Sequence, residues 1–376
     1  MFRRTLLLFA ILSFLSAPSS VIAAERLSLR SIYRQRIAFP KTGDLPYAQF
    51  DATGEMIHLI EPGQSRVRVI DWRKGQEVLA RQYSGIPCAD PTPGMRAIRE
   101  WEPLSTGLIF MRYCGSFYFL DSHTLDVKYK LEKGEEGFVG VAFSPNGKHM
   151  AVVVADANWE NRRIRVYELD TLTRIAEWPV THWAEFPTFT LDGKYLVSKV
   201  VELKPHTPDQ GVLERKACRV LSWRTDTWEL ATQKDYDPSA SPKGGGYARD
   251  CPGTIYAIPG RIDAFLDASF EQLRIRNLRT GEVERTIRAD RVLVRTAISH
   301  SGRWVAAGVH NDLFETPEYA QDFSIWDLQT GKLVYQPKKI PWFSLPRASY
   351  FTLSWSPDDR YLLVTRFEEI TVYQIE

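Results

Sequence analysis

The stretch Ile325-Trp326-Asp327-Leu328 is one of seven similar phrases, in which an apolar alternating run is followed by a polar residue and usually by an apolar one. The other six are Val69-Ile70-Asp71-Trp72, Phe119-Leu120-Asp121-Ser122, Val166-Tyr167-Glu168-Leu169, Val220-Leu221-Ser222-Trp223, Ile275-Arg276-Asn277-Leu278 and Val372-Tyr373-Gln374-Ile375. The polar positions 71, 121, 168, 222, 277, 327 and 374 are separated by 50, 47, 54, 55, 50 and 47 residues. Spacing this regular predicts a repeat architecture.

Turn-forming residues divide each repeat further. A tight polar turn precedes most of the phrases, at 51–55, 144–148, 191–194, 299–303 and 356–360, and degenerate versions stand at 104–107 and 259–260. Another turn follows the phrase, as in Thr280-Gly281-Glu282. Asn-Gly and Asp-Gly pairs supply the positive φ angles of hairpin turns. Four short strands per unit predict an all-β, seven-bladed β-propeller with four-stranded antiparallel blades.

The two ends of the chain suggest how the ring closes. The last repeat stops at Glu376, inside its third strand, so its blade lacks a fourth strand. An unassigned strand-like segment, 29–39, precedes the first repeat. We expect this N-terminal segment to complete the seventh blade, because an incomplete blade would leave an exposed strand edge.

The phrase Ile325-Trp326-Asp327-Leu328-Gln329-Thr330-Gly331-Lys332 and the turn Ser356-Pro357-Asp358 resemble those of WD-repeat and bacterial YVTN-type propellers. The resemblance covers essentially the whole chain after residue 23, at the level of architecture. It implies a propeller fold. The Gly-His pair that WD repeats carry ahead of their first strand is missing, so the hydrogen-bonded tetrad of that family is not expected.

The N-terminus predicts export. Arg3 and Arg4 precede an apolar run and a small-residue site at Ala23-Ala24, the pattern of a signal peptide over residues 1–23. Residues 24–376 then form one propeller domain, periplasmic or secreted, with no membrane span after signal cleavage. Removing Arg3 and Arg4 leaves 46 basic and 46 acidic residues, a balance that disfavours nucleic-acid partners.

The connections divide between two faces of the expected disc. Counting strands a to d outward from the channel, the a–b and c–d turns form a short-loop face, and the b–c and d–a connections form a long-loop face. The long connections are expected at 84–97, 155–163, 179–187, 203–217, 235–253, 309–322 and 337–348. Long connections on a rigid frame commonly carry binding residues. We therefore expect the long-loop face to be functional.

The four cysteines also belong to this face. An exported protein with Cys88, Cys114, Cys218 and Cys251 permits three pairings. Only Cys88 with Cys114 and Cys218 with Cys251 join neighbouring blades. We expect these two disulfides to tether long connections.

Aromatic, basic and other polar residues gather in the long connections and form the expected binding surface. They are Trp159, Arg162, Arg163, His182, Trp183, His310, Asp312, Tyr319, Trp342 and Arg347. Trp, Tyr and Arg dominate the binding energy of protein interfaces. The compact motifs for covalent haem, phosphate, zinc or calcium binding and for a serine nucleophile are absent, so no catalytic residue, metal or cofactor is expected.

Three functions fit these observations. The first is a non-catalytic binding or scaffold module that docks a protein or peptide through the long-loop face. The second, a fold-level resemblance, is the heavy, non-cofactor subunit of a periplasmic quinone-cofactor amine dehydrogenase. The third is a YVTN-like lactonase-type enzyme acting from the channel mouth, for which acidic residues such as Glu185 and Asp312 would be needed there.

Overall fold

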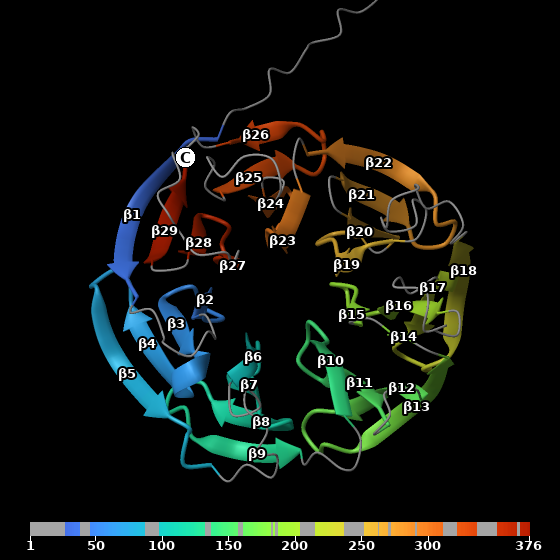
Figure 1. Ribbon diagram of the computed structural model, residues 1–376, viewed down its shortest axis with the longest axis horizontal. Coiled ribbons are helices and arrows are strands. Elements are labelled where there is room, and N and C mark those ends of the chain that lie inside the picture. The colour runs from blue at the N-terminus through green and yellow to red at the C-terminus, as the bar shows by residue number, and fades with distance from the viewer. Residues whose placement is uncertain are drawn as a thin grey trace, which may run out of the picture.

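Seven four-stranded antiparallel sheets stand in a ring in the computed structural model (Figure 1), which confirms the predicted fold. The structure describes residues 27–37, 46–86, 98–131, 137–156, 161–181, 183–184, 187–203, 215–236, 252–261, 263–269, 272–289, 292–310, 322–336, 352–366 and 369–376. Within these ranges the only helix is the short 3-10 turn η1 (Pro62–Gln64). None of the described residues forms a helix long and apolar enough to cross a bilayer.

The first four blades follow the expected order of strands. Blade 1 consists of β2 (Tyr47–Phe50), β3 (Met56–Glu61), β4 (Arg66–Asp71) and β5 (Gln76–Gln82). Blade 2 consists of β6 (Ile98–Pro103), β7 (Leu108–Tyr113), β8 (Ser116–Asp121) and β9 (Val127–Leu131). Blade 3 consists of β10 (Gly137–Phe143), β11 (His149–Ala155), β12 (Asn161–Glu168) and β13 (Arg174–Thr181). Blade 4, whose strand a is in two pieces, consists of β14 (Trp183–Ala184), β15 (Thr188–Phe189), β16 (Tyr195–Leu203), β17 (Arg215–Arg224) and β18 (Leu230–Tyr236).

The last three blades include the one that joins the two ends of the chain. Blade 5 consists of β19 (Thr254–Ala257), β20 (Ala264–Ser269), β21 (Gln272–Asn277) and β22 (Val283–Arg288). Blade 6 consists of β23 (Val292–Ile298), β24 (Trp304–His310), β25 (Asp322–Asp327) and β26 (Leu333–Tyr335). Blade 7 consists of β27 (Thr352–Trp355), β28 (Tyr361–Arg366), β29 (Glu369–Ile375) and β1 (Leu29–Arg36).

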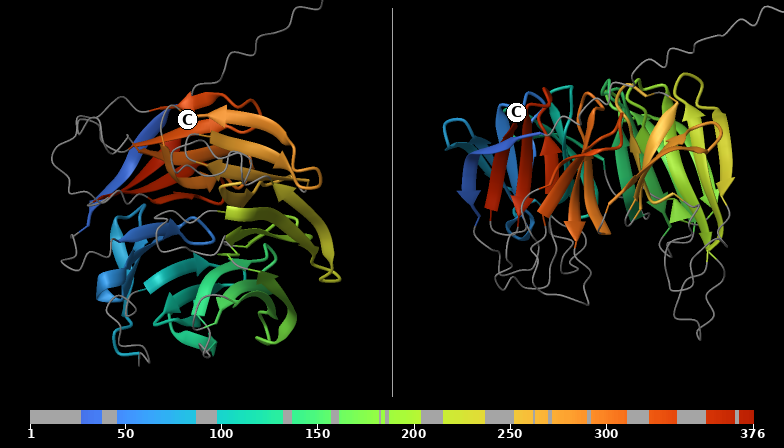
Figure 2. Two further views of the ribbon diagram at one scale, coloured as in Figure 1. Left: turned by 45° about the vertical axis from the view of Figure 1, so that its right-hand side comes forward. Right: turned by 90° about the horizontal axis from the view of Figure 1, so that it is seen from above.

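The N-terminal strand β1 closes the ring, as predicted. It pairs antiparallel with β29 from Leu29 opposite Ile375 to Arg36 opposite Glu369. Two further backbone hydrogen bonds join Ser28 and Glu376 at the end of this ladder. Figures 1 and 2 show β1 lying along the outer edge of β29, so the first and last strands of the chain share one sheet.

A β-bulge recurs in strand d of all seven blades. In each c–d pairing the register shifts by one residue near the start of strand d. The extra residue is Ile32 in β1 and Val78 in β5, at corresponding places in their blades. Because a bulge increases local twist and blunts an exposed edge, the N-terminal strand has the same edge geometry as the other outermost strands.

In four of the blades, the polar residue of the repeated phrase caps the c–d turn. Asp121 Oδ1 accepts hydrogen bonds from the amides of His123 (2.9 Å) and Thr124 (3.0 Å). Asp71, Asn277 and Asp327 accept turn amides in the same way. These residues therefore belong to the frame, in line with their regular spacing.

Blade 4 corrects one position of the predicted repeat. Its bulge lies opposite Ser222 and Trp223, and its turn hydrogen bonds involve the backbone of Arg224. Arg224 therefore occupies the place that the sequence pattern assigned to Ser222. Ser222 is buried instead and shares a hydrogen bond of 2.6 Å with Thr232 of β18. The sequence Leu221-Ser222-Trp223 resembles the repeated phrase, but its polar residue lies two positions before the residue that occupies the turn.

The described residues form seven apolar clusters, one in each seam between neighbouring blades. Inner strands such as β11 are buried along nearly their whole length because a blade covers each of their faces. The N-terminal segment contributes to two clusters. Leu27 and Leu29 pack in the seam between blades 6 and 7, and Tyr33 and Ile37 pack in the seam between blades 7 and 1.

The short-loop face is built from turns that are closed by their own side chains. In five a–b turns the first polar side chain accepts the amide five residues later, at 2.8–3.0 Å. The five acceptors are Asp51, Ser144, Thr190, Ser299 and Ser356. This local bond explains why the turns at 51–55, 144–148, 191–194, 299–303 and 356–360 share one pattern.

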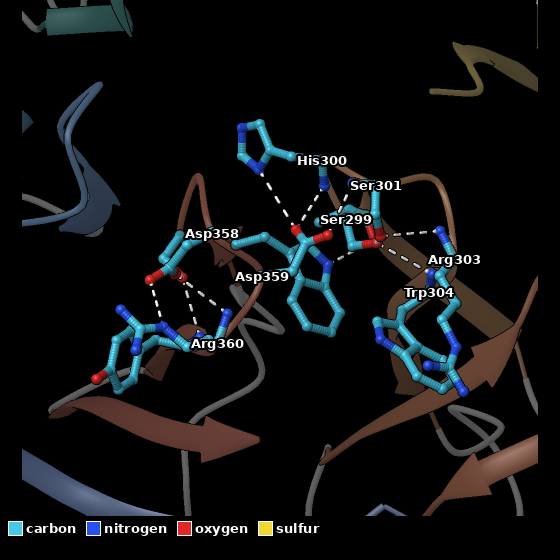
Figure 3. A network of polar contacts seen from close by, with 12 residues as sticks. Ser299, His300, Ser301, Arg303, Trp304, Asp358, Asp359 and Arg360 are labelled. Carbon is cyan, nitrogen blue, oxygen red and sulfur yellow. Dashed lines mark hydrogen bonds and ion pairs between the residues drawn. The ribbon is translucent and has the colours of Figure 1, made fainter. Parts of the chain in front are cut away.

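Asp359 links the a–b turns of blades 6 and 7 (Figure 3). Its Oδ1 accepts the amide of His300 at 2.6 Å and its Oδ2 accepts the amide of Ser301 at 2.7 Å. Asp359 has a φ of 57°, at the place where Gly302 of blade 6 has a φ of 72°. The left-handed conformation is unfavourable for a residue with a Cβ, but it aims the carboxylate across the seam.

The electrostatics of Asp359 favour its charged form. Partial burial raises the pKa of Asp359, but the hydrogen bonds from His300 and Ser301 outweigh this effect and hold the pKa below its ordinary value. A carboxyl group whose pKa is lower in the folded state stabilises the fold above its unfolded-state pKa. That stabilisation is lost as the pH falls through the folded-state pKa.

Deleting residues 25–39 should lower the melting temperature by about 10 °C or more. The deletion exposes the edge of β29 and removes buried side chains, each worth about 1.5–3 kcal/mol. Differential scanning calorimetry checks this expectation. As a control, Arg30→Ala removes an exposed hydrogen bond but keeps β1, and should change stability by only about 0.5 kcal/mol. A truncated protein that melts at the wild-type temperature would disprove the role of β1.

Replacing Asp359 by Asn should lower the free energy of unfolding by about 1–2 kcal/mol at pH 7, because the Asn amino group cannot accept the second backbone amide. The difference from the wild type should shrink as the pH falls below about 4. Urea unfolding at pH 7 and pH 2.5 measures both values. Asp170→Asn, at an exposed position in a turn of the same face, is the control and should change stability little at either pH. A pH-independent difference at position 359 contradicts the explanation.

Candidate binding face

The structure divides the predicted binding residues into two groups. Trp159, His182, Asp312, Tyr319, Trp342 and Arg347 lie outside the described residues, as do Cys88, Cys251 and the acidic residue Glu185. Arg162, Arg163, Trp183 and His310 lie within them. All four were expected in connections, but the structure places their backbones in strands β12, β14 and β24. The expected connections are therefore shorter than the sequence pattern indicated.

Arg162 and Arg163 face in opposite directions because they are consecutive in β12. Arg162 is only 4% exposed and lies on the side of the strand that carries Ile164 and Val166, which pack against blade 4. Arg163 is exposed on the other side and pairs with Glu177 of β13. The structure thus does not bring these two arginines onto one surface.

Trp183 and His310 mark the long-loop ends of their blades. Trp183 is the first residue of β14 and pairs with Val201 of β16. His310 is the last residue of β24 and pairs with Val292 of β23. Their backbone positions lie at the face where the sequence pattern placed the functional surface.

Two of the four cysteines lie among the described residues. Cys114 forms part of the two-residue turn between β7 and β8, with a φ of 52°, and Cys218 is fully buried in β17. Each belongs to a disulfide bond, and neither is a free thiol. The pairings of Cys88 with Cys114 and of Cys218 with Cys251 stay predictions, because the other two cysteines lie outside the described ranges.

Lys199 is a buried charged residue that the sequence reasoning missed. It lies in β16, is 2% exposed and faces blade 5 from the seam between blades 4 and 5. Its Nζ donates hydrogen bonds to the carbonyl oxygens of Pro252 and Gly253, each at 2.9 Å. These two residues directly precede β19, the inner strand of blade 5. A lysine of blade 4 therefore fixes the start of blade 5.

Asp267 completes this fixation from within blade 5. Its Oδ1 accepts a hydrogen bond from the amide of Gly253 at 2.6 Å, and its Oδ2 accepts a hydrogen bond from Nε of Arg276 at 2.8 Å. Arg274 Nε lies 3.4 Å from the same Oδ2. Asp267 is fully buried, and a buried carboxylate needs such partners to offset the loss of hydration.

The break in strand a of blade 4 lies opposite the same place. β14 pairs with Val200 and Val201, and β15 pairs with Leu196 and Val197, so Ser198 and Lys199 face the interval between the two short strands. In the sequence this site is visible only as a polar Ser-Lys pair inside the apolar run Leu196 to Val201. A pattern of apolar residues does not reveal which distant groups such a pair contacts. The sequence therefore assigned no role to Ser198 and Lys199.

Another buried group, His58, joins blades 1 and 2. Its Nδ1 accepts a hydrogen bond from Trp101 Nε1 at 3.1 Å. Burial lowers the pKa of His58 to about 4, so the imidazole is neutral at pH 7. A neutral, fully packed histidine serves as a structural acceptor between two blades.

The buried charged residues described above hold neighbouring blades together. The described ranges contain no group of three or more His, Cys, Asp or Glu side chains that could hold a metal ion. The charges of Lys199 and Asp267 are engaged by backbone groups and arginines at the base of the long-loop face. Glu185 and Asp312, which the lactonase alternative requires, lie outside the described part of the chain, so that alternative stays a prediction.

No protein-family model and no curated protein matches this chain. The observation that bears most on function is the difference between the two faces of the disc.

Replacing Lys199 by Met should lower the free energy of unfolding by about 2–4 kcal/mol, because two buried carbonyl groups lose their donor. Hydrogen exchange at residues 253–257 should accelerate more than at the distant β2. Lys194→Met, at an exposed turn position, is the control and should change little. Unchanged stability and exchange in Lys199→Met would show that Lys199 does not anchor the start of blade 5.

Proposed function

We propose that this protein is an exported, non-catalytic propeller that serves as a binding or scaffold module. In this proposal it docks a protein or peptide partner through the long-loop face. The WD-like phrase at 325–332 supports a repeat frame of this type, since Asp327 caps its turn through the amide of Thr330 at 2.7 Å.

The contrast between the two faces carries the proposal. On the short-loop face the turns are brief, closed by their own hydrogen bonds and linked across seams by groups such as Asp359. On the long-loop face, residues 204–214 separate β16 from β17, and residues 237–253 separate β18 from β19. Long segments on a rigid frame can present varied side chains without altering the frame.

Anchors at the base of the long-loop face support a role in specific binding. Lys199 and Asp267 hold Pro252 and Gly253 at the end of the connection from blade 4 to blade 5. Cys114 and Cys218 add covalent bonds at the b–c turn of blade 2 and in β17. Fixing the ends of a connection reduces the conformational entropy that is lost on binding.

Export is part of the same proposal. The charged and apolar pattern of residues 1–23 and its small-residue cleavage site support a periplasmic or secreted location. Disulfide-bonded Cys114 and Cys218 support it independently, because disulfides persist mainly in oxidising compartments.

Site-specific photocrosslinking in a periplasmic extract tests the docking face. A benzophenone side chain at Gln64 or Asn161, both exposed on the long-loop face, should capture a discrete partner. The same group at Ala52 or Arg279, exposed in turns of the short-loop face, is the matched control and should not. Capture from the two control positions and not from the first two would place the docking surface on the opposite face. Capture at Gln64 should also weaken in a folded Trp159→Ala, Trp183→Ala, Trp342→Ala variant.

A further inference from the structure

Three arginine side chains converge on one carboxylate on the outer part of blade 3. Arg163 Nη1 lies 3.2 Å from Glu177 Oε1, Arg165 Nε lies 2.8 Å from Oε2, and Arg174 Nη1 lies 2.6 Å from Oε2. Arg163 and Arg165 come from β12, and Glu177 and Arg174 come from β13. We call these four residues the blade 3 arginine cluster.

The recurring bulge of strand d creates this cluster. Arg165 lies directly opposite Glu177 in the ladder, and Val166 lies opposite Ala176. Without a bulge, Tyr167 would then face Ile175, but the register shift brings Arg174 opposite Tyr167 instead. Arg174 therefore lies on the same side as Glu177. In this blade the bulge re-aims a side chain, as bulges near functional sites often do.

In this cluster the exposed Arg163 and Arg174 share a single carboxylate. Partial burial raises the pKa of Glu177, but the hydrogen bond from Arg165 and the charges of all three arginines outweigh this effect and lower the pKa. Glu177 is therefore ionised at neutral pH, and its single negative charge balances only one of the two guanidinium groups of Arg163 and Arg174. The side chains of Arg163 and Arg174 are 45% and 53% exposed, so the excess charge is accessible to solvent.

This excess sets the cluster apart from other exposed ion pairs in the described ranges. Arg66 and Arg68 share two carboxylates, Glu61 and Glu77, and so form a neutral group. Arg261 pairs with two carboxylates, those of Asp263 and Glu284. Arg219 and Asp235 form a simple pair. Glu177, by contrast, is a half-buried carboxylate that three arginines share.

We propose that the blade 3 arginine cluster binds an acidic segment of a protein partner. The inference deepens the proposed function and rests on it. Arg163 is the third residue of β12, near the long-loop face, and Arg174 begins β13 at the opposite end of the blade. A partner docked on the long-loop face would thus meet Arg163 first and extend its carboxylates along the outer part of blade 3. Arginine suits this role because its planar guanidinium pairs with carboxylates through two hydrogen bonds.

A decaglutamate peptide at low ionic strength is the probe, with binding followed by fluorescence anisotropy. Each exposed ion pair is worth about 0.2–1 kcal/mol, so Arg163→Ala with Arg174→Ala should weaken binding about twofold to thirtyfold. Glu177→Gln should tighten binding severalfold, because it removes the competing carboxylate. Arg219→Ala, which breaks an isolated exposed pair on blade 4, is the matched control and should bind like the wild type.

The outcomes separate this inference from the proposed function, because the peptide requires no natural partner. Equal binding by the wild type and the double arginine variant overturns the inference, and so does an equal weakening of binding in Arg219→Ala. Neither result affects the proposed docking face, which the crosslinking experiment tests separately. Vesicles that contain phosphatidylglycerol form a second arm. Cluster-dependent binding to these vesicles without binding to the peptide also overturns the inference, since the cluster would then recognise a lipid surface.

Discussion

The pairing of β1 with β29 is the constraint on which the rest of the structure depends. Each blade covers its neighbour, so a ring of seven sheets has no terminal blade that could leave an apolar face open. That arrangement holds only if the blade built from both chain ends is complete. Strand β1 completes it with the same bulge as every other strand d, and together with its flanking residues it places Leu27, Leu29, Tyr33 and Ile37 in two seams. The pairing of β1 with β29 therefore completes the hydrogen-bonded sheet of blade 7 and two apolar clusters at the same time.

Closure also explains why the two faces of the disc differ. Apolar clusters between blades fix the strands, and polar contacts such as those of Asp359, His58 and Lys199 fix neighbouring blades to each other. Once the frame is fixed in this way, the length of a connection has little influence on it. Variation can accumulate on one face while the turns of the other face keep a uniform hydrogen-bonding pattern.

The fold could be predicted from the sequence because its signals are local and repeated. Turn residues such as Ser144 and Asp121 bond to amides within five residues, so the same requirement recurs in other blades and is visible without knowledge of the fold. The prediction failed where local resemblance misled, as at Ser222, whose place in the repeat belongs to Arg224. The lengths of β12, β14 and β24 were also underestimated, because strand ends at the long-loop face carry polar residues like those of loops.

The candidate sites were less predictable because their partners are distant in the sequence. Lys199 bonds to residues more than fifty positions away, so no periodic pattern reveals that it is buried. The cluster around Glu177 depends on a shift of one residue in the ladder, which reverses the side to which Arg174 points. The sequence identified Arg163 as a candidate binding residue. It did not indicate that Glu177 is the carboxylate with which Arg163 pairs.

The place of β1 also sets the order of events during synthesis. Its partner β29 lies far later in the sequence, so β1 stays unpaired until β29 has been synthesised. Until then the outer edge of β29 does not exist, and the seams on both sides of blade 7 lack the apolar side chains of β1. Contacts between such distant residues form slowly. Apolar side chains of both seams therefore stay exposed until the ring closes, and exposed apolar surface of this kind favours aggregation.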